Sequence, residues 1–267
     1  MRRILITNDD GYISKGLYIL YEAVKDLGEA RIYSTELPRS AIAHTISFNK
    51  PLRLMKTTHL GYPVYVTDGS PIDSLYLAMA VHGFKPNIVL SGVNVGENLS
   101  LQHIFYSGTI AVAIEAALNN IPAIAFSADV QSFDEFDNPV LASTIKNIAK
   151  NLTMKILENG LPRGVDLLSV NFPSKENIRN CIRVVRAATK RWRALFEQRL
   201  DTRGRPYYWL QTLPIKPEPG TDVYSVVVEG CVAVTPLSIN LNSVPEEAYQ
   251  VLENLVRGVE KATRKRG

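Results

Sequence analysis

Short apolar stretches alternate with segments of helical periodicity from residue 3 to residue 172, and this order constrains the fold more than any other feature. Strands that alternate with helices form right-handed βαβ units, which assemble into a mainly parallel sheet with helices on both faces. We therefore expect an α/β fold. The expected strands are residues 3–6, 30–33, 87–90, 123–126 and 167–172, and the expected helices are residues 17–27, 70–78, 110–118 and 140–158.

The character of the chain changes after about residue 180, where helical periodicity fades. Asp201-Thr202-Arg203-Gly204 is typical of a turn between two strands and predicts a long hairpin. A capping-box pattern at residues 243–246 predicts a final helix. We expect a core at residues 1–180 and, at residues 181–267, an extension of hairpins closed by a terminal helix. The extended segments expected there are residues 182–185, 207–210, 224–228 and 231–235.

Composition sets broad limits on function. The chain has 267 residues, of which 46% are hydrophobic and 21% charged, so it is globular and can bury a sizeable core. Its formal net charge of +4 suits a phosphorylated small molecule as ligand. The same charge is weak evidence for nucleic acid, and we expect no stable nucleic-acid complex.

Neither a signal peptide nor a membrane span is expected. Met1-Arg2-Arg3 leads into only a short apolar stretch before an acidic pair, and no apolar run approaches the ~20 residues that span a bilayer. Cys181 and Cys231 lie in apolar, strand-like stretches and are interpreted as packed free thiols. Nothing therefore argues for an oxidising compartment, and we expect a cytoplasmic protein without membrane attachment.

Asp9 and Asp10 follow directly after the first strand. In an open α/β sheet, ligands bind at the carboxyl ends of the strands. Two adjacent carboxylates repel each other unless a cation or a shared proton relieves them, so the pair predicts a metal site. The alternative is that one aspartate caps the following helix, although a cap needs only one carboxylate.

Residues 91–98 (Ser-Gly-Val-Asn-Val-Gly-Glu-Asn) follow another buried strand and bring Asn94 and Asn98 to the same sheet edge. Asparagine can offer its carbonyl oxygen to a hard cation or its amide N–H to an anion. An ordinary asparagine-rich turn is the alternative. Ser40, in a loop after the second strand, is either a further oxygen ligand or an ordinary turn serine.

Ser107, Gly108 and Thr109 precede an alanine-rich helix. Unpaired backbone N–H groups and the helix dipole at such a start favour a phosphate group, and two hydroxyls add to them. Simple N-capping by Ser107 or Thr109 is the alternative. No Walker lysine follows and no GxGxxG pattern occurs, so neither a nucleoside-triphosphate P-loop nor a dinucleotide fingerprint fits.

Oxygen donors dominate this set of residues, which favours Mg²⁺ or Mn²⁺ over Zn²⁺. The sequence has no HExxH pattern, no Cys/His cluster and no GxSxG elbow. The histidines at 44, 59, 82 and 103 are interpreted as structural or exposed, although His44 and His103 lie in loops near the expected site.

A set of motifs, in order along essentially the whole chain, is similar to that of the SurE family, the survival-protein-E phosphatases. The early motifs are Asn8-Asp9-Asp10-Gly11, Arg39-Ser40, Gly69-Ser70-Pro71-Ile72-Asp73, residues 91–98 and Tyr106-Ser107-Gly108-Thr109. The later ones are Asn171-Phe172-Pro173, Arg191-Trp192, Tyr207-Tyr208-Trp209, Thr221-Asp222 and Thr235-Pro236-Leu237.

The resemblance implies a divalent-metal-dependent phosphomonoesterase that hydrolyses nucleoside 5′- or 3′-monophosphates and other phosphate monoesters. It also implies a Rossmann-like core, a protruding hairpin, and a carboxyl-terminal element that swaps between the protomers of a dimer, with tetramers in some members. One Mg²⁺ or Mn²⁺ per subunit would be held by Asp9, Asp10, Ser40 and Asn94, and the two aspartates would be catalytic. The residues implied near the phosphate are Asn8, Asn94, Asn98, Ser107, Gly108 and Thr109.

Residues 99–105 depart from the family pattern. Members of the family usually carry a glycine and an aspartate-containing stretch there, whereas Leu-Ser-Leu-Gln-His-Ile-Phe has no carboxylate and is one residue longer. The departure bears on substrate preference and on access to the site. His103 is a candidate for the missing proton donor.

Two other functions match part of the sequence. A family member that binds a nucleotide or RNA with little turnover is suggested by the lost carboxylate and by the basic segment 183–205, whose arginines would otherwise be solvated on an exposed hairpin. A receiver-type signalling domain also places an acidic pair after its first strand. It needs a phosphoacceptor aspartate at the end of a central strand, where this chain has Ser91-Gly92.

Overall fold

The computed structural model describes residues 1–264, without the side chains of residues 254 and 257–264. Backbone contacts divide the chain into two compact units, Met1–Leu237 and a second unit that begins at Ser238. This division differs from the one near residue 180 that the sequence suggested, because strands β8 and β11 of the extension pair with the core sheet.

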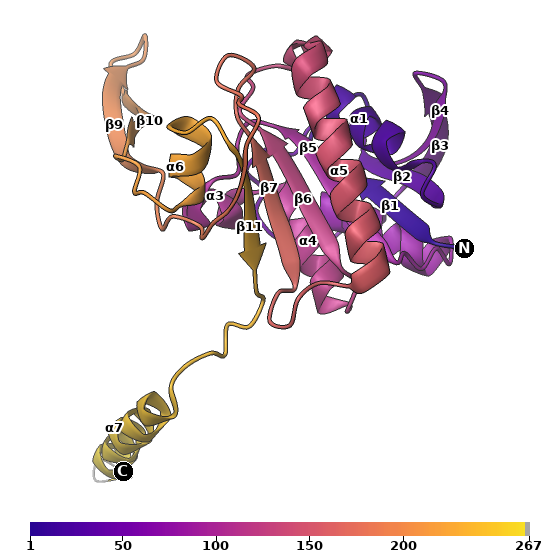
Figure 1. Cartoon of the computed structure of the whole chain (residues 1–267). Helices are drawn as coiled ribbons and strands as arrows, with labels where there is room; N and C mark the ends of the chain where they lie inside the picture. The colour runs from indigo at the N-terminus through magenta and orange to yellow at the C-terminus, as the bar shows by residue number, and fades with distance from the viewer. Residues whose placement is uncertain (265–267) are drawn as a thin grey trace. The chain divides into compact units, whose positions relative to one another are not determined.

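A nine-stranded sheet with the order β3-β4-β2-β1-β5-β6-β7-β11-β8 runs through the first unit (Figure 1). The six neighbouring strands from β4 to β7 are parallel, whereas β3 and β11 are antiparallel to β4 and β7. The mainly parallel α/β fold is thus confirmed. The strands are β1 (Arg3–Thr7), β2 (Glu29–Thr35), β3 (Leu54–His59), β4 (Tyr62–Thr67), β5 (Ile88–Val95), β6 (Ala123–Ala128), β7 (Leu167–Phe172), β8 (Ile182–Val184) and β11 (Val232–Leu237).

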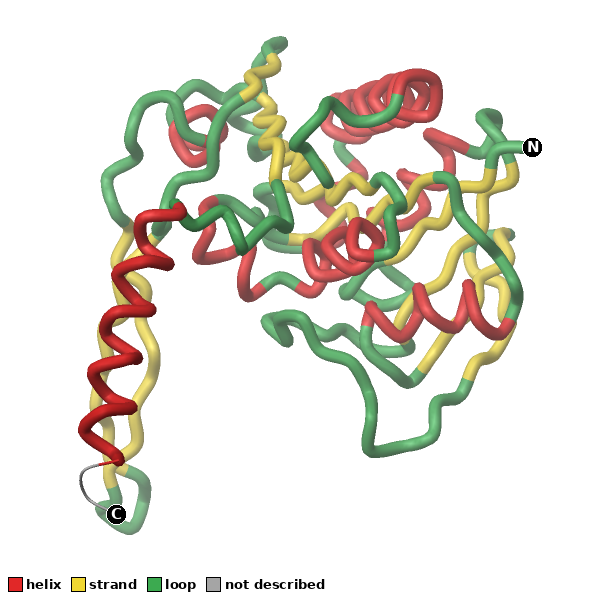
Figure 2. The backbone as a smooth tube through the Cα atoms, turned by 90° about the horizontal axis from the view of Figure 1, so that it is seen from below, coloured by secondary structure: helices red, strands yellow, loops and turns green. Residues whose placement is uncertain are grey.

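Helices cover both faces of this sheet, as Figures 1 and 2 show. Helices α1 (Lys15–Val24) and α5 (Pro139–Asn159) pack against each other on one face, and α2 (Pro71–Tyr76) and α4 (Gly108–Leu118) pack together on the other. The shorter elements of the first unit are η1 (Leu77–Val81), α3 (Ser100–Tyr106), η2 (Phe133–Asp137) and α6 (Asp222–Val227).

Helix α1 shows how apolar spacing holds the sheet edge in place. Leu17, Leu20 and Val24 are fully buried and share one core cluster with Ile4 and Ile6 of β1. Full burial of one such side chain stabilises the fold by roughly 1.5–3 kcal/mol. The end of β1, where the acidic pair begins, is therefore anchored by the core beneath it.

A long hairpin follows the core, as the turn signal at residues 201–204 predicted. Strands β9 (Trp192–Leu200) and β10 (Pro206–Pro214) form a separate antiparallel sheet in which Trp192 pairs with Pro214. Oδ1 of Asp201 accepts hydrogen bonds from the backbone N–H groups of Arg203 and Arg205, at 2.8 and 2.9 Å, and closes the turn.

Two local expectations were wrong. Residues 224–228 are not extended, because α6 covers most of them and is capped by Thr221, whose hydroxyl accepts from the backbone N–H of Tyr224. The strand expected at residues 87–90 does not end there. It continues to Val95, with a register shift between Ser91 and Asn94 that lets Asn94 and Val95 pair with β6.

The interpretation of the two cysteines as free thiols was also wrong. Cys181 and Cys231 form a disulfide with their Cα atoms 4.8 Å apart. The parallel pairing of β8 with β11 brings them together, since Val232 lies opposite Ile182 and the backbone N–H of Val232 donates to the carbonyl of Cys181. The argument against an oxidising compartment, which rested on free thiols, loses its basis.

The second unit contains the predicted terminal helix, α7 (Glu246–Arg264). Its described apolar side chains at 251, 252, 255 and 256 are exposed within this single chain. Across the part of the chain that the structure describes, no single helix is both long and apolar enough to cross a membrane; the nearest candidate is the pair α3 and α4, which meet at a bend of 80°.

Candidate functional site

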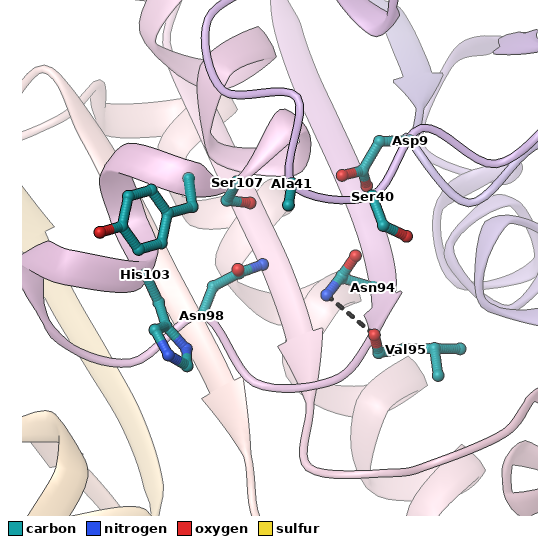
Figure 3. Close-up of a pocket in the computed structure, with 9 residues that line it drawn as sticks. Asp9, Ser40, Ala41, Asn94, Val95, Asn98, His103 and Ser107 are labelled. Carbon is teal, nitrogen blue, oxygen red and sulfur yellow. Dashed lines mark hydrogen bonds between the residues drawn. The ribbon is translucent and has the colours of Figure 1, made fainter. Parts of the chain in front are cut away.

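The predicted site lies where the order of the strands reverses. From β1 the chain first adds β2 on one side and later β5 on the other, so a crevice forms at the carboxyl ends of β1 and β5. A cavity of about 230 Å³ opens there (Figure 3). Its lining residues are Asp9, Ser40, Ala41, Asn94, Val95, Asn98, His103, Tyr106 and Ser107.

Asp9 is joined directly to the start of helix α4. Its side chain is buried, and the hydroxyl of Thr109 donates a hydrogen bond to its Oδ1. Gly108 makes this approach possible, because a Cβ at that position would lie only 2.8 Å from Oδ2 of Asp9. The glycine of the Ser-Gly-Thr motif is therefore required for space.

Asp10 is held against strand β5. Its Oδ2 accepts from the backbone N–H of Val95 over 2.8 Å, which leaves Oδ1 for another partner. Asp10 is as deeply buried as Asp9, although it is not among the residues that line the cavity. The neighbouring carboxylates thus reach two different elements, α4 and β5, from the end of one strand.

Burial dominates the electrostatics of this pair. It raises the pKa of Asp9, while the hydrogen bond from Thr109 and nearby backbone N–H groups act to lower it. Burial, with a further contribution from the charge of Asp9, raises the pKa of Asp10 to about 7. Two buried carboxylates that hinder each other's ionisation form a place where a divalent cation is strongly favoured.

Asn94 presents its side-chain oxygen to the same point. Its Nδ2 donates to the carbonyls of Val95 and Gly96, at 3.1 and 2.7 Å, so its orientation is fixed (Figure 3). Its Oδ1 lies 3.3 Å from the hydroxyl of Thr109, which also contacts Asp9. The structure therefore brings the predicted ligands from β1 and β5 together.

Ser40 lies on an exposed loop that crosses the cavity. The loop is fastened at both sides of the serine, because the backbone N–H of Arg39 donates to the carbonyl of Asp9 (2.7 Å) and that of Ala43 to the carbonyl of Tyr106 (3.0 Å). Figure 3 shows the Ser40 side chain next to Asp9. His44, on the same loop, is turned away to Glu115 of α4, at 2.6 Å.

The donor set fits a hard cation. Asp9, Asp10, Ser40 and Asn94 offer only oxygen, and oxygen donors are the preferred ligands of Mg²⁺ and Mn²⁺. Within the described residues, no group of three or more histidine, cysteine or acidic side chains is arranged to hold a metal. The set described above is of a different kind, because two acidic side chains are joined in it by the neutral oxygen donors Ser40 and Asn94.

The predicted phosphate-binding residues separate into two groups. Ser107 and Asn98 line the cavity: the hydroxyl of Ser107 caps α4 by accepting from the N–H of Ile110, and Nδ2 of Asn98 donates to Ser127. Asn8, in contrast, is fully buried and absent from the lining. Its amide accepts from Ser34 and donates to the carbonyl of Gly11, which shapes the turn after β1.

Sequence reasoning missed a network beside the cavity. Its centre is His103, whose Nδ1 lies 2.8 Å from Oε2 of Glu97. Nε2 of the same ring accepts from Nε1 of Trp192 over 2.7 Å. Arg191 forms an ion pair with Glu97 at 3.0 Å. Burial lowers the pKa of His103, and Glu97 reverses this so that the net change is upward. No local signal links His103 with Trp192, 89 residues later.

Comparison with known proteins gives consistent results. The family model described as Survival protein SurE matches residues 4–194. The 5′-nucleotidase SurE of Hyperthermus butylicus is 42% identical, over 98% of this chain and 95% of that protein. The corresponding protein of Thermofilum pendens is 44% identical, over 89% and 91%. A crystal structure of the SurE protein from Aquifex aeolicus superimposes with a TM-score of 0.76 at 31% identity, over 94% of this chain and 97% of that one.

Proposed function

Because the chain belongs to the SurE family, we propose that it is a divalent-metal-dependent phosphomonoesterase that hydrolyses nucleoside 5′- or 3′-monophosphates and other phosphate monoesters. The observation that carries this proposal is the junction of Asp9 with the start of α4, through Thr109. It places a buried acidic pair, which favours a cation, beside a helix start, which favours an anion.

The cation site of the proposal consists of Asp9, Asp10, Ser40 and Asn94, with one ion per subunit. Mg²⁺ or Mn²⁺ bound there would polarise a phosphoryl oxygen and lower the pKa of a water molecule. The carboxylate of Asp9 is kept in place by Thr109, and that of Asp10 by the N–H of Val95. Each of the two carboxylates is therefore held by a hydrogen bond to one of its oxygens.

The phosphoryl group would lie in the 230 Å³ cavity. In hydrolysis the bond between phosphorus and the ester oxygen breaks, and a bond to the oxygen of water forms. Backbone N–H groups in the first turn of α4 and the positive end of its dipole would stabilise the charge on the phosphoryl oxygens. Ser107 and Asn98, which line the cavity, would orient them.

An aspartate could instead attack phosphorus, and the two routes are distinguishable. A rapid-quench experiment would trap an acyl phosphate on Asp9 or Asp10 if the carboxylate is the nucleophile. With a substrate whose phosphoryl group is made chiral by oxygen isotopes, direct attack by water would invert the configuration at phosphorus, whereas an aspartyl phosphate intermediate would retain it.

The test of the proposed function is a phosphatase assay with nucleoside monophosphates and p-nitrophenyl phosphate in Mg²⁺, Mn²⁺ and EDTA. We expect activity that requires a metal and falls at least about 100-fold in Asp9→Asn and Asp10→Asn. Asp26→Asn, which removes an exposed carboxylate of the same type, is the control and retains activity. Metal-independent turnover by either active-site variant would contradict the proposal.

A family member that binds nucleotide or RNA with little turnover is the second candidate, favoured by the absence of a carboxylate from residues 99–105. Calorimetry with a nucleoside monophosphate or a short RNA, combined with the assay above, separates the two functions. Tight binding without release of phosphate would favour the second.

We also propose a homodimer, or a tetramer built from it, in which the exposed apolar side chains of α7 pack against another protomer through a swapped carboxyl-terminal element. Light scattering on the full-length chain tests this assembly. A cytoplasmic location remains part of the proposal, and cell fractionation tests it.

A further inference from the structure

Trp192 is the first residue of β9. Its indole N–H is held by a series of hydrogen-bonded side chains that begins with His103. The indole N–H can only donate, so Nε2 of His103 must accept and the proton of the imidazole lies on Nδ1, facing Glu97. Arg191 binds the other oxygen of Glu97. Both ring nitrogens of His103 are thus occupied, and the histidine is better suited to orient Trp192 than to donate a proton to a substrate.

The backbone around Trp192 is held by the same helix that carries His103. Oε1 of Gln102 accepts from the backbone N–H groups of Arg191 and Trp192, at 3.1 and 3.2 Å. The backbone N–H of Leu101 donates to the carbonyl of Ala188 over 2.7 Å. Helix α3 and the base of the hairpin are therefore joined by hydrogen bonds. The contacts come from residues 99–105, the segment that departs from the family pattern.

The side chains of Tyr106, His103 and Trp192 form an aromatic wall. The ring centroid of Trp192 lies 6.4 Å from that of Tyr106 and 6.3 Å from that of His103. Tyr106 is 47% exposed, so part of the wall is accessible. Figure 3 shows His103 on the side of the cavity opposite Asp9.

A second cavity, of about 460 Å³, adjoins the 230 Å³ cavity at His103, which lines both. Trp192 gives the second cavity an aromatic side, and Asp129, Gln131 and Thr212 give it polar groups. A flat ring with hydrogen-bonding edges matches such a lining, because the indole offers a face for stacking and the polar groups offer hydrogen bonds.

We propose that this second cavity receives the nucleobase of the substrate, which stacks on Trp192, and that His103 is a positioning residue that sets the plane of the indole. This inference rests on the proposed function, because it assumes a nucleotide whose phosphate lies near Asp9. Stacking is available to every base and increases with ring size, so purine nucleotides bind more tightly than pyrimidine nucleotides.

Intrinsic fluorescence tests the contact directly, because the chain has two tryptophans. In Trp209→Phe only Trp192 remains, and saturable quenching is expected with a nucleoside monophosphate but not with ribose 5-phosphate. In Trp192→Phe only Trp209 remains, which is 56% exposed on β10, and no saturable quenching is expected. Equal quenching of Trp192 by both ligands, or of Trp209 by the nucleotide, would overturn the proposal.

Kinetics tests the role of His103. Trp192→Ala should raise KM for a purine nucleoside monophosphate about tenfold, while KM for ribose 5-phosphate changes less than about twofold. His103→Leu should raise the nucleotide KM with little change in kcat, and should have no further effect in the Trp192→Ala background. A fall in kcat for both substrates in His103→Leu would instead assign the histidine to the chemistry.

The outcomes also separate this inference from the proposed function. If neither ribose 5-phosphate nor any nucleotide is hydrolysed, the proposed function fails, although quenching of Trp192 still reports base binding. If both are hydrolysed with equal kcat/KM and Trp192→Ala lowers both values equally, the phosphatase stands and the base site is refuted.

Discussion

The hydroxyl of Thr109 donates a hydrogen bond to Oδ1 of Asp9 and so joins the first turn of α4 to the end of β1. These residues are 100 positions apart in the chain. The contact ties the acidic pair to the start of the helix, and the phosphatase proposal depends on this arrangement.

Thr109→Val, which keeps the shape of the side chain and removes its hydroxyl, should lower kcat/KM about tenfold, since a hydrogen bond to a charged group contributes roughly 1.5–3 kcal/mol. The Thr109 hydrogen bond lowers the pKa of Asp9, so its loss raises that pKa. The acid limb of the pH–rate profile should therefore move to higher pH. Thr109→Ser retains the hydroxyl, and its profile should stay in place; a shift of equal size in both variants would contradict this explanation.

Gly108→Ala should impair the site without unfolding the protein. The new Cβ would lie 2.8 Å from Oδ2 and 2.9 Å from Cβ of Asp9, so the aspartate or the helix start must move. Alanine favours helix by up to about 1 kcal/mol over glycine, which limits any loss of stability. We expect a Tm lowered by no more than a few degrees together with weaker Mn²⁺ binding by isothermal titration calorimetry. Leu118→Ala, on the exposed end of the same helix, should leave metal affinity unchanged.

Much of the site could be predicted because its residues follow strands. Asp9, Asp10 and Asn94 come at the ends of apolar runs, and parallel pairing of β1 with β5 brings these ends together. Strand β5 itself was shortened in the prediction, because Ser91, Gly92 and Asn94 have the composition of a loop. Strand pairing keeps this segment in the sheet, because Ser91 lies opposite Thr7 of β1 and Asn94 pairs with Ser127 of β6 after the register shift.

The failures share a physical cause, which is dependence on tertiary contacts. The β-branched run in α6 favours a strand locally. It forms a helix because Val223 and Val226, three positions apart, are buried together in a cluster that also contains Leu99 and Ala188. Asn8 stays a predicted phosphate-binding residue, and its hydrogen bonds with Ser34 and Gly11, which no local pattern indicates, hold it in the turn after β1.

Asp10→Asn should change how the stability of the metal-free protein depends on pH. The pKa of Asp10 is about 7 in the folded protein, whereas the ordinary value of an aspartate, which applies in the unfolded chain, is 3.8. Between pH 3.8 and pH 7 the folded protein therefore holds a proton on Asp10 that the unfolded chain has released. Stability therefore falls as pH rises from about 4 to 7 and does not recover above it. Asparagine removes this loss, and in EDTA at pH 8 the Tm of Asp10→Asn should exceed that of the wild type by about 3 °C or more.

Added Mn²⁺ should reverse this order, because the metal compensates the charge that destabilises the wild type. At pH 8 the wild-type Tm should rise with Mn²⁺ and that of Asp10→Asn should rise much less. Asp26→Asn, on the surface, should behave as the wild type in both conditions. A wild-type Tm that is insensitive to Mn²⁺ at pH 8 would argue against a metal site at the pair.

Asp222 is a buried carboxylate whose removal should destabilise the first unit. It accepts from the backbone N–H groups of Ser100, Ala188 and Val223, at 2.7, 2.8 and 2.7 Å, and so joins α3, the segment before the hairpin and α6. Asp222→Ala leaves these donors without an acceptor, and we expect a loss of about 3 kcal/mol or more in urea unfolding. Asp222→Asn keeps one acceptor oxygen and should lose less; equal losses would show that the negative charge, rather than the acceptor, is what matters.

Reduction of the disulfide between Cys181 and Cys231 should lower stability by an amount set by the chain that it closes. The cysteines are 50 positions apart, and closing a loop of that length stabilises a fold by about 4 kcal/mol in the chain-entropy account. The bond fastens β8 to β11 at the edge of the sheet that is far from β1. Cys181→Ser/Cys231→Ser should therefore reduce Tm by several degrees while kcat/KM at 25 °C stays within about twofold. Dithiothreitol should reduce the Tm of the wild type and leave that of the double variant unchanged, and an equal effect on both proteins would show that the bond does not form in solution.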